Sequence, residues 1–122
     1  MRLSILLLMG LFWGGFAYAD IDSERLATAI YHAEGGLKAS KPYGVLKSYC
    51  KKGDPDGQCR KGCIQTIEGF KERVKNNPII HDDKSFITAF GRRYCPEGSD
   101  TDNGTCQFWA GNVYSIYKKG TK

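Results

Sequence analysis

Residues 29–36 read Ala-Ile-Tyr-His-Ala-Glu-Gly-Gly and close the first helix that the sequence predicts. Asp22 is suited to cap the start of this helix, because a short acidic side chain accepts hydrogen bonds from free backbone N–H groups. The glycine pair stops it, since glycine adopts the left-handed conformation of a helix C-cap without strain. One face is apolar at a spacing of three or four residues, through Leu26, Ile30 and Ala33. Glu34 is therefore expected in the last turn, beside a buried face.

The position of Glu34 is compatible with acid catalysis. Two effects favour the protonated form of a carboxyl there: the partial negative charge at the helix C-terminus, and apolar neighbours that disfavour ionisation. A protonated carboxyl near neutral pH is what cleavage of a glycosidic bond requires, because the leaving oxygen must accept a proton. A solvated glutamate in a last helical turn is the alternative interpretation, since many helices end in this way.

The segment around Glu34 resembles the lysozyme-like superfamily, in which a helix ends with the catalytic glutamate followed by a small residue. Residues 43–46, Tyr-Gly-Val-Leu, are similar to the stretch that lines the substrate groove of lytic transglycosylases. Later segments are similar to small exported lysozyme-like proteins: 63–67, 93–96 and 109–113. The resemblance covers nearly the whole chain after residue 19, in the order of its elements.

The resemblance implies a two-lobed cleft in which Glu34 is the general acid, and later the base, acting on the glycan strands of peptidoglycan. Tyr43 and the backbone of Gly44 would help to hold the sugar, and no metal or other cofactor is implied. The chain departs from the better-known transglycosylases at Gly35, where they carry serine, and at residues 45–47, which replace most of a Gly-Leu-Met-Gln-like run. Hydrolysis and transglycosylation both stay open, because they differ only in whether water or the sugar's own hydroxyl captures the intermediate.

A second carboxylate is less evident. Asp54 and Asp56 could face Glu34 across a cleft, as two-acid glycosidases require, but acids in a Gly-Asp-Pro-Asp-Gly stretch are typical of a turn. A substrate with a 2-acetamido group supplies its own nucleophile, so a single-acid mechanism fits this chain better. Trp109 is expected in the core, whereas Tyr43, in a Pro-Tyr-Gly turn, is expected to be exposed and able to stack on a sugar ring.

The fold class that follows is α+β, mostly α: a lysozyme-like domain of about four helices, with a small β or irregular hairpin after the first. No repeat or linker divides residues 20–122, so they are expected to form one domain. Residues 45–50 are the strand candidate, between turn-like segments rich in glycine and proline. Apolar stripes and caps predict the later helices at about 58–75, from 82 or 83 to before Pro96, and from 103 or 105 onward.

All five cysteines, at positions 50, 59, 63, 95 and 106, follow the leader, and export makes disulfides the expected state for a chain of this size. The odd number leaves one thiol unpaired. The resemblance implies a bridge between Cys63 and Cys95, which occupy matching places on two helices. The second bridge would most simply join Cys50 and Cys59 across the turn, leaving Cys106 free. A zinc site at Cys50, Cys59 and Cys63 is the alternative, although no CxxC occurs.

Residues 1–19 are predicted to be a cleaved signal peptide. Arg2 gives a positive start, an apolar run follows, and Ala-Tyr-Ala at 17–19 is typical of a cleavage site. An uncleaved anchor is the alternative, but the apolar run of about 14 residues is shorter than the roughly 20 that span a bilayer. Export to the periplasm or the extracellular space is therefore expected, with no stable membrane span after cleavage.

The net charge of +5 favours anionic partners. Nucleic acid is not expected, because the basic residues are scattered among acids and a signal peptide precedes them. Peptidoglycan strands are the expected partner. Two other functions stay open: a module that binds glycan in the same cleft without cleaving it, and a disulfide-stabilised envelope protein with a partner in a secretion or conjugation apparatus.

Overall fold

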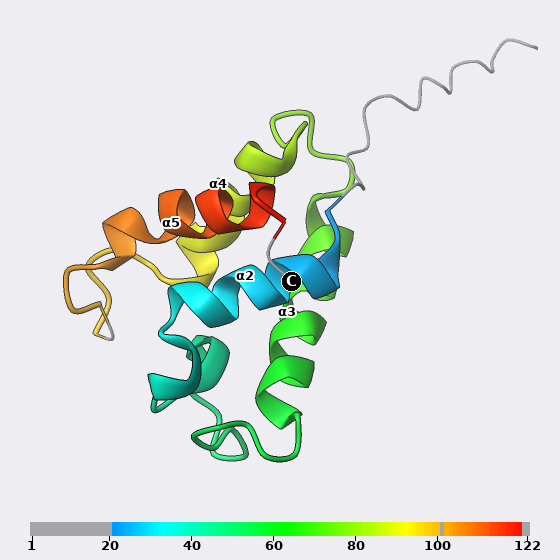
Figure 1. Ribbon diagram of the computed structural model, residues 1–122. Coiled ribbons are helices and arrows are strands. Elements are labelled where there is room, and N and C mark those ends of the chain that lie inside the picture. The colour runs from blue at the N-terminus through cyan, green and yellow to red at the C-terminus, as the bar shows by residue number, and fades with distance from the viewer. Residues whose placement is uncertain (1–20, 101, 121–122) are drawn as a thin grey trace, which may run out of the picture.

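Four α-helices and two single-turn 3-10 helices organise the residues that the computed structural model describes, 21–100 and 102–120. In chain order they are α2 (Ser23–Ala33), η2 (Gly36–Lys38), η3 (Pro42–Gly44), α3 (Gln58–Val74), α4 (Asp83–Tyr94) and α5 (Cys106–Lys118) (Figure 1). The four helices confirm the mostly helical class. The signal peptide predicted for residues 1–19 lies outside the described residues.

Helix α2 has the boundaries that its sequence predicts. The Asp22 side chain accepts a hydrogen bond from the backbone N–H of Arg25 and caps the start of the helix. Glu34 is the C-cap residue, and Gly35 follows with a φ of 110°, in the left-handed region. The glycine therefore turns the chain away from the helix axis immediately after Glu34.

Residues 45–50, the strand candidate, form no strand, because the described part of the chain contains none, and the irregular alternative describes this segment. Backbone N–H groups between α2 and α3 bond to carbonyls three residues earlier, as in turns. Examples are the pairs Val45–Pro42, Cys50–Lys47 and Asp54–Lys51. Because these local bonds occupy the backbone groups that a ladder would need, the segment between η3 and α3 is irregular.

Side chains also fix the starts of the two middle helices. Asp54 accepts hydrogen bonds from the backbone N–H groups of Cys59 and Arg60, at 2.8 and 3.1 Å, in the first turn of α3. At the start of α4, Asp82 and Ser85 form a reciprocal capping box. Asp54, in the acidic turn before α3, thus has a structural role. This agrees with its interpretation as a turn residue.

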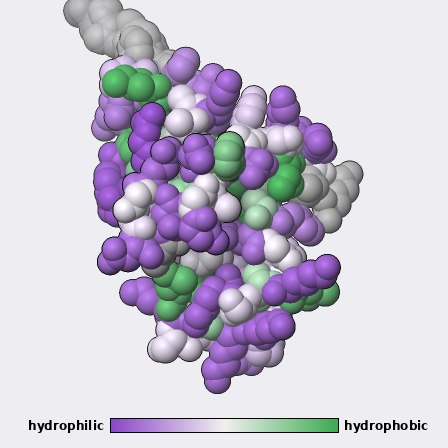
Figure 2. All heavy atoms as spheres, turned by 90° about the vertical axis from the view of Figure 1, so that its left-hand side faces the viewer, coloured by the Kyte–Doolittle hydropathy of each residue, from purple (hydrophilic) through white to green (hydrophobic). Residues whose placement is uncertain are grey.

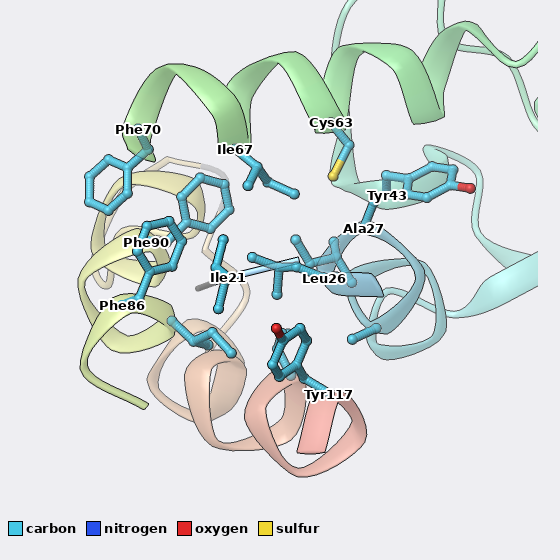
Figure 3. Close-up of a cluster of buried hydrophobic side chains, with 14 of the residues drawn as sticks. Ile21, Leu26, Ala27, Tyr43, Cys63, Ile67, Phe70, Phe86, Phe90 and Tyr117 are labelled. Atoms are coloured by element: carbon cyan, nitrogen blue, oxygen red, sulfur yellow. The ribbon is translucent and has the colours of Figure 1, made fainter. Parts of the chain in front are cut away.

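Helix α2 crosses the middle of the molecule and packs against α5 on one side and α3 on the other, while α4 packs against α5 (Figure 1). The core draws on all four helices (Figure 3). Phe70 of α3 meets Phe86 and Phe90 of α4 with ring centroids 5.4 Å apart in both pairs. Within the described residues, no helix is both long enough and apolar enough to cross a membrane.

Two disulfides join residues that are near in sequence: Cys50 to Cys59, as predicted across the turn, and Cys95 to Cys106. The predicted bridge between Cys63 and Cys95 is wrong, and so is the expectation that Cys106 is free. Cys106 opens α5 just after a short loop, which places its Cα 5.2 Å from that of Cys95. Cys63 is a free, fully buried thiol that points from α3 into the core, on the side where Tyr43 lies (Figure 3). Disulfides are the bonds expected of an exported protein.

Candidate active site

Glu34 is half-buried at the end of α2, and a residue of the last helix holds its carboxylate. The indole Nε1–H of Trp109 donates a hydrogen bond to Glu34 Oε2 at 2.9 Å. Trp109 is otherwise buried, with 6% of its surface exposed, as predicted for a core residue. Because α5 packs on α2, Trp109 holds one carboxylate oxygen of Glu34, although the two residues are 75 positions apart. The apolar stripe of α5 did not reveal this role of Trp109.

The backbone of η3 lies directly against this carboxyl group. Gly44 has a φ of 71°, and a Cβ atom at this position would lie 2.9 Å from Glu34 Oε2. Any larger residue at this position would displace the carboxylate from where it lies. The preceding residue, Tyr43, also has a positive φ, of 62°, which is unfavourable for a side chain with a Cβ. Strained backbone of this kind persists only where its surroundings hold it, and it is frequent at functional sites.

Tyr94, at the end of α4, holds this turn in place. Its hydroxyl donates a hydrogen bond to the backbone carbonyl of Tyr43, and its ring packs against the rings of Phe90 and Trp109. Burial raises the pKa of Tyr94 far above its ordinary value, with the neighbouring Cys63 as a further cause. The hydroxyl therefore stays protonated and remains a donor to the turn.

Two adjoining hollows form a groove along this turn. One, of about 480 Å³, is lined by Glu34 together with Ala39, Ser40, Lys41, Gly44, Leu46, Tyr94, Cys95 and Asn103. The other, of about 200 Å³, shares Gly44, Leu46 and Tyr94 with the first and adds Val45, Lys47, Tyr49, Gly62, Thr66 and Arg93. We call the two together the Glu34 groove. Figure 2 shows the side of the molecule where the segment after α2 and the loop before α5 lie, and hydrophilic side chains cover most of it.

The two predicted sugar-binding residues have different places. Gly44 lines both hollows, and its role in binding a sugar stays a prediction. The prediction of an exposed Tyr43 ring is wrong, because only 6% of the residue is exposed. The left-handed backbone turns the ring inward, where it lies 5.0 Å from the ring of Tyr31 and its hydroxyl accepts a hydrogen bond from Arg60. Tyr49, 47% exposed, is the more accessible aromatic residue lining the groove.

Glu34 is the only carboxylate among the described residues that line the groove. Neither Asp54 nor Asp56 lines either hollow, and the Asp54 carboxylate is occupied by the first turn of α3. A second acid across the groove is therefore not present at the positions that the sequence suggested.

The zinc alternative is not compatible with the sulfur chemistry of the structure. Cys50 and Cys59 are bonded to each other, so neither is available as a thiolate ligand. Over residues 21–100 and 102–120, no group of three or more histidine, cysteine, aspartate or glutamate side chains is placed to hold a metal ion.

Comparisons of the chain with protein-family models, with curated proteins and with solved structures find no match. Two residues of the site, Trp109 and Tyr94, were not assigned to it from the sequence. Their spacing predicts only core positions, since both rings are apolar and the partners of their polar atoms lie on other elements.

Proposed function

We propose that this protein is a peptidoglycan-cleaving glycosidase of the lytic transglycosylase or lysozyme type, with a lysozyme-like fold. Glu34 is its general acid and then its base, acting on β-1,4 bonds between amino sugars in the periplasm or outside the cell. The observation that carries the proposal is a single half-buried carboxylate that lines an open groove and is held by Trp109 on one oxygen. The resemblance of residues 29–36 and 43–46 to lysozyme-like enzymes supports the same assignment.

In this proposal the two carboxylate oxygens have different tasks. Trp109 occupies Oε2, which leaves Oε1 to carry the proton towards the glycosidic oxygen. As the C–O bond breaks, the proton moves to the leaving sugar and the electron pair of the bond leaves with it. The indole N–H then stabilises the carboxylate that is formed, because a hydrogen bond to an ionised acceptor is stronger than one to a neutral acceptor.

One acid is sufficient for the complete reaction. The 2-acetamido group of the substrate stabilises the positive charge that develops at the anomeric carbon. In the second step, the Glu34 carboxylate takes a proton from the attacking hydroxyl, which belongs either to water or to the sugar itself. The first route is hydrolysis, and the second gives an anhydro sugar end.

The test compares oxidised protein lacking residues 1–19 with its Glu34→Gln variant on purified peptidoglycan, with products identified by mass spectrometry. We expect the wild type to release soluble muropeptides and the variant to be slower by about 10²- to 10⁴-fold, the usual effect of removing a general acid. Glu97→Gln is the matched control, since Glu97 is an exposed carboxylate that does not line the groove. Anhydro ends would identify a transglycosylase. Folded wild type that releases nothing would contradict the proposal.

The absence of a second acid among the residues described in the groove favours one other function, a module that binds glycan without cleaving it. Binding to purified sacculi without release of sugar would select that function. Folded protein that neither binds nor cleaves sacculi would favour a structural role in the envelope, with a partner in a secretion or conjugation apparatus.

A further inference from the structure

Three exposed cations line the Glu34 groove. Lys41 lines the larger hollow, and Lys47 and Arg93 line the smaller one. None of the three has a side-chain ion pair within the part of the chain that the structure describes. Elsewhere the structure pairs cations with nearby acids, as in Arg60 with Glu24. The groove thus holds cations that remain available to a ligand.

The charges of the groove do not balance. Against the three cations stands one acid, Glu34, among the described residues that line it. The Trp109 N–H already bonds one oxygen of that acid. Exposed charges interact over about 8 Å at physiological ionic strength, so an anionic group that binds beside any of these cations is attracted to it. A neutral polymer gains hydrogen bonds from the cations but no net charge attraction.

The groove also has apolar surface. Leu46 lines both hollows and is 61% exposed, and Tyr49 lines the smaller one. An exposed leucine and an exposed aromatic ring offer surface to the apolar faces of sugar rings, which leaves the cations to contact substituents of the strand. The groove therefore suits a strand whose sugars pack on the apolar surface and whose acidic substituents reach the rim.

We propose that Lys41, Lys47 and Arg93 make the groove selective for glycan strands that carry carboxylate groups over neutral amino-sugar polymers. The inference rests on the proposed function, because it takes a glycan as the ligand of the groove. In peptidoglycan, the carboxylates are those of the peptide stems and of the lactyl groups that carry no stem. The three cations act as specificity determinants, since each lines the groove with no acidic partner of its own and can pair with a substituent of the strand.

The experiment measures binding in the Glu34→Gln background, so that the probes stay intact. Trp109 is the only tryptophan after residue 19 and lies at the groove, so its fluorescence reports occupancy. The probes are soluble peptidoglycan fragments, the same fragments with their carboxylates converted to amides, and chitohexaose. We expect the native fragments to bind about tenfold more tightly than either neutral probe, and less so at high salt, because exposed ion pairs are individually weak and screened.

A matched pair of triple variants assigns the selectivity to the groove. Changing all three rim cations, as Lys41→Gln, Lys47→Gln and Arg93→Gln, is expected to abolish the preference for native fragments while chitohexaose binding stays the same. The control removes the same charge outside the groove, as Arg73→Gln, Lys75→Gln and Lys119→Gln, and is expected to retain the preference.

The outcomes separate this inference from the proposed activity. Equal binding of the three probes, or equal loss of preference in both triple variants, would overturn the selectivity even if the wild type cleaves peptidoglycan. Selective binding by a protein that releases no sugar would uphold the selectivity and contradict the cleavage. Failure of all three probes to bind would overturn the inference together with the assignment of glycan to this groove.

Discussion

At the scale of single residues, the site depends on a glycine that contacts an acid. Gly44 has both a left-handed backbone and a carboxylate oxygen 2.9 Å from the place of a Cβ atom. The two requirements are physically separate, because one concerns the backbone and the other the space beside it. Another glycine of the chain meets only the first: Gly53 has a φ of 82° and no heavy atom within 4 Å of its Cβ position.

This difference makes Gly44→Ala a sharp test, with Gly53→Ala as its control. Both variants are expected to lose about 1–2 kcal/mol of unfolding free energy, because alanine is strained at positive φ. Only Gly44→Ala displaces the Glu34 carboxyl, so its activity is expected to fall by a further ~10- to 100-fold. Denaturant unfolding and muropeptide release measure the two effects. Equal activity in the two variants would show that contact with Gly44 does not position the acid.

At this scale, the sequence predicted the acid and the glycine but not the contacts that position them. Helix periodicity and the glycine stop suffice to place Glu34, since both are local. The burial of Tyr43 depends on its positive φ and on the hydroxyl of Tyr94, 51 residues away. No local pattern contains that information. The Pro-Tyr-Gly turn therefore predicted an exposed Tyr43, although its side chain is buried.

At the scale of elements, two of the helices start at caps that are visible in the sequence, whereas residues 45–50, the strand candidate, are irregular because turns compete for their backbone groups. Asp22 and Asp82 cap α2 and α4 as their sequences predict. The disulfide pairing was predicted only in part. A bridge across a short turn, such as Cys50–Cys59, can be predicted with little knowledge of the fold. Excluding Cys63 from a disulfide requires knowing that its side chain faces the core.

The bridge between Cys95 and Cys106 fixes the start of α5, three residues before Trp109. The two bridges span similar separations, 11 and 9 residues, so chain entropy predicts a similar loss of about 3 kcal/mol on removing either. When both Cys95 and Cys106 are replaced by serine, we also expect the hydrogen bond between Trp109 and Glu34 to be lost. Replacing Cys50 and Cys59 by serine is expected to leave that hydrogen bond in place.

Tryptophan fluorescence on the folded variants distinguishes the two pairs, and thermal unfolding checks that their stabilities match. A change in the emission of Trp109 only when the bridge at α5 is removed would support a positioning role for that disulfide. The same emission in both variants would show that packing of α5 alone orients the indole.

At the scale of the whole molecule, the core and the groove share one buried group. The Cys63 thiol lies among core residues and neighbours the Tyr94 hydroxyl, which holds the turn of the groove. Burial raises the pKa of Cys63 from its ordinary value of 9.0 to about 11. The protonation of this thiol is therefore linked to folding of the whole chain.

The sign of the linkage gives a prediction for alkaline pH. Below pH 9 the thiol is protonated in both the folded and the unfolded chain, and it does not affect the pH dependence of stability. Above pH 9 the unfolded chain releases the proton while the folded chain keeps it until about pH 11. The free energy of unfolding is therefore expected to fall over this range by about 2–3 kcal/mol through Cys63 alone. In Cys63→Ala this contribution is absent, although the loss of packing lowers stability at every pH. Denaturant unfolding at pH 8 and at pH 11 measures the free energy of unfolding of wild type and variant. The advantage of the wild type is expected to be smaller at pH 11. The same advantage at both pH values would mean that ionisation of the buried thiol is not coupled to folding.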